Sequence, residues 1–144
     1  MSQSTTSSSD VGALTIVVRL FCVVPFLTGI ADVLGGAWIL GLAGAVLPVD
    51  IASDPVINNQ IAFWGAIWFG FGVCLWWISY DPLGRAAIAR MLFVVLFLSG
   101  LARFYAWVRW GYPGPVLVGA MTIELVLSPV LLLWLNRLQQ LSRL

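Results

Sequence analysis

The sequence contains no histidine and no lysine, and charged residues of any kind make up only 9% of its 144 residues. Without histidine, the chain lacks the side chain that most often binds metals and acts as a general base near neutral pH. The seven basic residues are all arginine and face six acids, so we expect no nucleic-acid partner. Soluble domains carry roughly a quarter charged residues. So low a charge content excludes a soluble fold and predicts an integral membrane protein.

Cysteine is also scarce. Cys22 and Cys74 lie in separate apolar runs, with neither a C-x-x-C spacing nor a zinc-ligand pattern. We expect both to be small apolar core residues and expect no metal and no cofactor. Because histidine and lysine are absent and no activated nucleophile is visible, the sequence predicts a protein that is not an enzyme.

Hydrophobic residues, by contrast, make up 61% of the chain, and its mean hydropathy is +1.01. Four apolar stretches are long enough to cross roughly 30 Å of hydrocarbon as helices. They cover about residues 11–34, 61–80, 86–108 and 115–136, and the last two breaks are rich in proline and glycine. The predicted fold class is an all-α integral membrane protein, built as a bundle of four transmembrane helices in the lipid bilayer.

The remaining segments are assigned by length and polarity. Residues 1–10 read MSQSTTSSSD and predict a disordered polar tail without the basic start of a signal peptide. Residues 35–48 are apolar but span only about 21 Å as a helix. We expect them to form a short interfacial helix that bends at Gly35-Gly36, with a fifth, broken span as the alternative. Residues 11–138 then form the membrane domain, and 139–144 form a cytoplasmic tail.

The arginines indicate an orientation. Arg85 and Arg90 flank the break between the second and third spans, and Arg137 and Arg143 follow the fourth span. The opposite side has Arg109 alone. Since cytoplasmic loops carry the excess of positive charge, we expect both termini in the cytoplasm.

Two charged residues, Arg103 and Glu124, lie inside the predicted transmembrane spans. Glu124 lies deep in the fourth apolar stretch, where an unpaired carboxylate costs several kcal/mol. Arg103 lies about 10 Å before the end of the third span, and Glu124 lies about 13 Å after the start of the fourth, which is the same side of the membrane. Adjacent antiparallel helices thus place opposite charges at nearly the same depth. The alternatives are a structural ion pair, an arginine that reaches the membrane surface, and a ligand or proton site.

Other polar side chains share these faces and depths. Asp32 ends the first span at the same level, and Gln60 begins the second. Ser99 shares the face of Arg103, and Ser128 shares that of Glu124. We expect these four residues to join the pair in one binding or structural polar cluster. The tryptophans at 64 and 68 lie deeper than those at the helix ends and are candidates for lining a cavity.

The second half of the chain carries a recognisable pattern, NNQIAFWGAIWFGFGV, then GLARFYAWVRWGYPGP, then TIELVLSP. It resembles a family of small four-helix bacterial membrane proteins described only as domain of unknown function 4345. The resemblance covers about residues 11–138 and is most specific at Arg103, Gly111, Pro113 and Glu124. It implies a fold and a bacterial inner-membrane location, and it implies no activity.

Three functions fit the sequence. The first is an accessory or binding bundle that packs against a larger membrane complex or holds an apolar ligand. The second is a dimeric proton-coupled transporter of small molecules that uses Glu124. The third is a lipid-modifying enzyme, which would have to work without histidine, lysine or a plausible set of metal ligands. The sequence favours the first.

Overall fold

The computed structural model describes residues 8–143, and every regular element within them is helical. The elements are α1 (Ser8–Gly35), the 3-10 helix η1 (Gly36–Ala43), α2 (Val49–Ala52), α3 (Pro55–Ile78), α4 (Ala86–Trp110) and α5 (Pro115–Leu141). Helices α1, α3, α4 and α5 are long and apolar enough to cross a membrane. The predicted all-α membrane bundle with four spans is confirmed.

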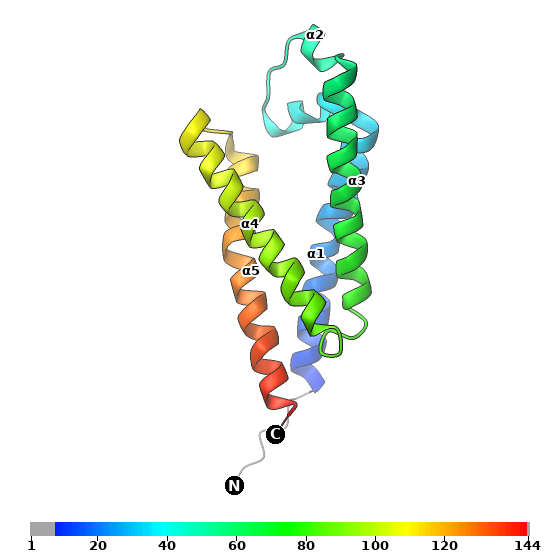
Figure 1. The fold of residues 1–144 in the computed structure, drawn as a ribbon, viewed down its shortest axis with the longest axis vertical. Coiled ribbons are helices and arrows are strands. Elements are labelled where there is room, and N and C mark those ends of the chain that lie inside the picture. Colours follow the sequence, from blue (N-terminus) through cyan, green and yellow to red (C-terminus); the bar gives the residue numbers. More distant parts are fainter. Residues whose placement is uncertain (1–7, 144) are drawn as a thin grey trace.

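The four long helices form two antiparallel hairpins. Backbone contacts are dense between α1 and α3 and between α4 and α5, whereas contacts from one hairpin to the other are sparse. Figure 1 shows that the hairpins meet at the end where the described chain begins and finishes, and diverge toward the opposite end. We call these the terminal end and the distal end.

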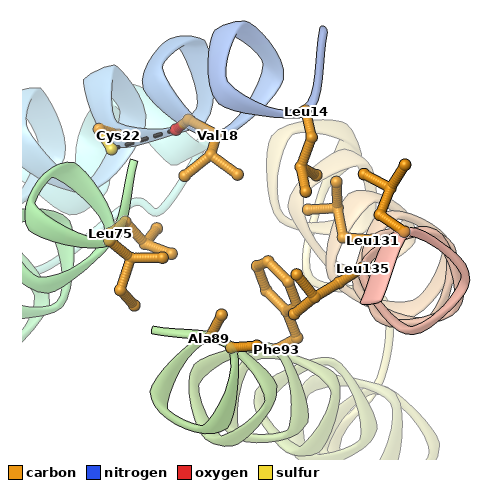
Figure 2. Close-up of a cluster of buried hydrophobic side chains, with 11 residues drawn as sticks. Leu14, Val18, Cys22, Leu75, Ala89, Phe93, Leu131 and Leu135 are labelled. Carbon is orange, nitrogen blue, oxygen red and sulfur yellow. Dashed lines mark hydrogen bonds between the residues drawn. The ribbon is translucent and has the colours of Figure 1, made fainter. Parts of the chain in front are cut away.

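The hydrophobic core lies in the terminal half, where all four long helices contribute to it. Leu14 and Val18 from α1 meet Leu75 from α3, Phe93 from α4 and Leu135 from α5, and each is at most 2% exposed. Figure 2 shows these side chains converging from four directions. Burial of this shared apolar surface, together with close packing, holds the two hairpins together.

Glycines set the distance between α1 and α3. A Cβ atom at Gly65 would lie 2.6 Å from the Cβ of Asp32 and 2.8 Å from the carbonyl oxygen of Gly29. A Cβ at Gly72 would press on the ring of Phe26 at 3.1 Å. The two backbones can therefore approach closely only because these positions lack side chains. The glycine at position 70 has no atom within 4 Å of its ideal Cβ, so that face of α3 is not packed in the described structure.

Helix bounds differ from the expected spans by more than two residues at three ends. Helix α1 already includes residues 8–10 of the predicted disordered tail, and the other tail residues lie outside the described part of the chain. Helix α3 begins at Pro55 rather than at 61, because the Asp54 carboxylate accepts from the amides of Val56 and Ile57. Helix α5 continues to Leu141, beyond the expected end of the fourth span.

The segment between α1 and α3 folds over the distal end. It leaves α1 at Gly36, whose φ of +53° allows a sharp turn that other residues rarely adopt. The short helix expected over residues 35–48 is a 3-10 helix that ends at Ala43. Contacts of η1 with α1 and α3 keep it beside the distal parts of both helices (Figure 1).

Candidate functional site

An ion pair between α4 and α5 lies at the centre of the candidate site. The Nε of Arg103 donates to both carboxylate oxygens of Glu124, at 3.1 Å to Oε1 and 3.0 Å to Oε2. The two partners differ in exposure: the side chain of Glu124 is 6% exposed and that of Arg103 is 41% exposed. The terminal amino groups of Arg103 have no hydrogen-bond partner among residues 8–143, so part of the guanidinium remains available.

Small neighbours allow this pair to form. A Cβ at Gly100, one turn before Arg103, would lie 3.0 Å from the Cβ of Glu124 and 2.9 Å from the side chain of Leu125. Helix α4 can thus come close to α5 at this level. The hydroxyl of Ser128 donates to the backbone carbonyl of Glu124 at 2.5 Å, one turn further along α5. The bond satisfies that hydroxyl within its own helix and leaves the carboxylate to Arg103.

The charged side chains continue the stripes that form the core. On α4, the buried residues Phe93, Leu96 and Gly100 lead at helical spacing to Arg103. On α1, the stripe of Leu14 and Val18 leads in the same way to Asp32. The face that carries apolar core residues in the terminal half therefore carries charges in the distal half, where the hairpins diverge (Figure 1).

Asp32 brings a second carboxylate to the site from the other hairpin. It lies within electrostatic range of Arg103, with no hydrogen bond or ion pair between the two in the described residues. Asp32 is only partly buried and accepts no hydrogen bond from another residue in the part of the chain that the structure describes. Together with Glu124 it gives the site two carboxylates and one guanidinium, a formal net charge of −1.

Two tryptophans of α3 lie within one turn of the point where this helix meets Asp32. The Cβ of Asp32 packs against Gly65, which Trp64 precedes by one residue and Trp68 follows by three. The indole N–H of Trp68 donates to the hydroxyl of Thr28 at 2.8 Å, and its ring stacks on Phe71 with centroids 5.1 Å apart. Trp68 is thus held in a fixed orientation, while 58% of the surface of Trp64 is exposed.

Three of the six residues predicted for the polar cluster, Asp32, Ser99 and Gln60, make no hydrogen bond to another member of it in the described chain. Ser99 donates to the carbonyl of Leu96 within α4, at 2.8 Å. Gln60 is exposed on α3 and makes no hydrogen bond within the described residues. The structure thus brings together Arg103, Glu124 and, through its charge, Asp32.

Asn58 has a structural role that the sequence analysis did not identify. Its Oδ1 accepts from the amide of Ala37 at 2.8 Å, and its Nδ2 donates to the carbonyls of Ala52 and Asp54 at 2.9 and 2.8 Å. Asn58 therefore fastens η1 and α2 to the start of α3. In the sequence, a single asparagine near the start of a helix is only a weak signal for such a role.

Arg19 also has partners that lie far away in the sequence. Its Nε donates to the hydroxyl of Ser79 at 3.2 Å, and its guanidinium lies 5.5 Å and 5.3 Å from the ring centroids of Trp76 and Tyr80. The partners come from the end of α3, and no local pattern connects them to Arg19.

Two further features bear on what the site can bind. An apolar groove of about 340 Å³ lies between α1 and α3 in the distal half; it is lined by Gly29, Ile30, Val33, Leu34, Ala66 and Phe69, none of which belongs to the charged cluster. Residues 8–143 contain no group of three histidine, cysteine or acidic side chains placed to hold a metal ion. The cluster can therefore offer charge, hydrogen bonds and aromatic faces to a ligand.

Comparison with known families gives one match. The family model described as Domain of unknown function (DUF4345) matches residues 13–135, which is most of the chain. No curated protein and no solved structure matches it. The chain belongs to this family, as the sequence pattern predicted.

Proposed function

We propose that this member of the DUF4345 family is a binding protein of the membrane, which holds a largely apolar molecule with one polar group between its two helical hairpins. The single observation behind this is the half-exposed Arg103, which lies on a core-facing stripe, inside an apolar span, and is not covered by the other hairpin. A buried ion pair offsets its desolvation cost only when further hydrogen bonds satisfy the remaining donors, and here the terminal amino groups of Arg103 have no such partner in the described chain.

The chemistry of the distal half supports a binding role. Charged groups in apolar spans are costly and usually line water-filled or ligand-filled space. Here Asp32, Arg103 and Glu124 occupy that position together, with Trp64 and Trp68 beside them. The terminal half has the ordinary apolar core, so the polar residues are not needed to hold the hairpins together.

The proton-coupled transporter is less well supported. Glu124 would have to release and take up a proton, but both of its oxygens are engaged by Arg103. An enzyme is also less well supported, because the cluster offers no nucleophile with an adjacent base. We therefore propose a non-enzymatic role in a bacterial inner membrane, with both termini in the cytoplasm.

Gentle extraction of the tagged protein from its native membrane, followed by mass spectrometry, tests this proposal. We expect one small molecule at near-stoichiometric amount, depleted when Trp64 is replaced by alanine and retained in a Trp77→Ala variant at the terminal end of the same helix. A stoichiometric larger protein without such a molecule would instead indicate an accessory subunit. A self-contained dimer with proton-linked flux would indicate the transporter.

A further inference from the structure

We propose that the ligand bound between the hairpins is an amphiphilic cation, whose positive group lies beside Asp32 and the indole rings of Trp64 and Trp68. The inference deepens the proposed function and rests on it. It commits to the charge of the ligand, which the proposed function leaves open.

The charges of the cluster favour a cation. Arg103 is bound through its Nε by both oxygens of Glu124, so the positive charge of this pair is already compensated. Asp32 adds a further negative charge and has no hydrogen-bond or ion-pair partner in the described chain. An anion entering this space would meet two carboxylates for one guanidinium. A cation would meet a formal net charge of −1 in a setting where water screens it weakly.

The aromatic side chains favour the same ligand. Indole rings attract cations through the negative face of their π systems, and tryptophan is the strongest of the aromatic residues in this respect. Trp68 is fixed by Thr28 and Phe71, so it is ordered before a ligand arrives. Trp64 is more than half exposed and directly precedes Gly65, against which Asp32 packs.

The ligand must also be apolar over most of its surface. The helices around the cluster have exposed apolar side chains, including Ile67 on α3 and Leu101 on α4, and the charged residues lie within the long apolar helices rather than at their ends. A small hydrated cation that entered the cluster would lose part of its water shell, and it has no apolar surface whose burial would offset that cost. A lipophilic ammonium or phosphonium ion satisfies both requirements.

Two ions of matched shape and opposite charge test the inference, namely tetraphenylphosphonium and tetraphenylborate. Their binding to the full-length protein in dodecyl maltoside is measured by titration calorimetry. We expect saturable binding of tetraphenylphosphonium, at least about tenfold tighter than any saturable binding of tetraphenylborate. Asp32→Asn should weaken binding of the cation by about tenfold or more, and Trp64→Leu by about fivefold.

Matched variants separate a loss of the site from a loss of the fold. Asp50→Asn removes an exposed acid from α2 at the same end of the protein and should leave binding unchanged. Asp32→Glu restores the charge and should recover most of the affinity. Each variant is accepted only if its circular dichroism and unfolding temperature match those of the parent. Asp32→Asn with undiminished affinity in a folded protein would contradict the inference.

The remaining outcomes distinguish this inference from the proposed function. Preferential binding of tetraphenylborate that is lost in Arg103→Gln would show a site for anions. Such a result, or a neutral or anionic molecule in the native extract, would overturn the cation and leave the binding role in place. Saturable binding of neither ion and no co-purifying small molecule would overturn both.

Discussion

Glu124 and Arg103 form one ion pair, yet their surroundings differ, and this difference sets what each substitution costs. Arg103→Gln leaves a 6% exposed carboxylate without its donor, for which we expect a loss of about 3–5 kcal/mol in the free energy of unfolding. Glu124→Gln leaves a guanidinium that is 41% exposed and can turn toward Asp32 or water, so about 1–2 kcal/mol should be lost. Chemical unfolding in detergent measures both.

The double variant and a control on the same helix complete this test. Replacing both residues by glutamine should recover part of the loss seen in Arg103→Gln, because no buried charge remains. Arg109→Gln removes an exposed arginine at the end of α4 and should change stability by less than about 0.5 kcal/mol. Equal losses in the two single variants, or strict additivity in the double variant, would show that the pair isn't coupled as the structure indicates.

Two neighbouring asparagines give a second prediction at the scale of single residues. Asn58 makes three hydrogen bonds to the backbone of the distal segment, whereas Asn59 is exposed and makes none within the described residues. Asn58→Ala should therefore loosen residues 37–53 and cost about 1–3 kcal/mol, since it leaves backbone groups without partners. Hydrogen exchange of residues 37–53 should rise in Asn58→Ala and not in Asn59→Ala. Equal hydrogen exchange in Asn58→Ala and Asn59→Ala would contradict the structural role of Asn58.

At the scale of helices, the α1–α3 hairpin depends on glycine at the points of closest approach. Gly65→Ala would place a methyl group 2.6 Å from Asp32 Cβ and 2.8 Å from a backbone carbonyl oxygen, so the helices must separate. We expect a loss of about 1–3 kcal/mol, measured by unfolding in detergent. Gly70→Ala on the same helix meets no atom within 4 Å and should be neutral or slightly stabilising. A clear loss in Gly70→Ala would show that this face is packed against another molecule.

Much of the helix arrangement could be predicted because it depends on local sequence. Apolar runs of sufficient length and breaks of proline and glycine define the four spans. The pairing of Arg103 with Glu124 could also be predicted, since depth is counted from one short turn between adjacent helices. Gly65 and Gly72 lie seven residues apart and therefore share one face of α3, and both are buried against α1.

Other features depend on contacts between distant elements and could not be predicted. The partners of Arg19 lie 57 or more residues away, at the end of α3. The role of Asn58 follows from the left-handed turn at Gly36, which directs the chain back over α3. Gln60 stays outside the charged cluster because of the rotation of α3 about its own axis. A single sequence does not determine that rotation.

At the scale of the whole molecule, the structure divides the bundle into a closed terminal half and a more open distal half. The apolar core joins the hairpins at the terminal end, and the charged cluster lies where they diverge. Asp32 takes no part in the apolar core and makes no ion pair in the described residues. Substitutions such as Asp32→Asn can therefore change the cluster while the core that holds the hairpins together remains intact.

The distribution of arginine gives a final prediction, which concerns orientation in the membrane. Four arginines, at positions 85, 90, 137 and 143, lie near the terminal end of the spans. Arg109 lies near the distal end. Because positive charge accumulates on cytoplasmic loops, the terminal end should face the cytoplasm. The test uses two variants, each with a single cysteine introduced at an exposed position of one end. Both variants also lack the exposed native Cys74.

Positions 53 and 142 suit this test because both are exposed serines in the structure. A membrane-impermeant maleimide added to intact cells should label Ser53→Cys. It should label Ser142→Cys only after the membrane is opened, since the charge bias places α5's end inside. Parallel labelling of both variants in opened membranes controls for reactivity. Labelling of Ser142→Cys alone in intact cells would reverse the orientation, and the charged cluster would then lie in the cytoplasmic half of the membrane.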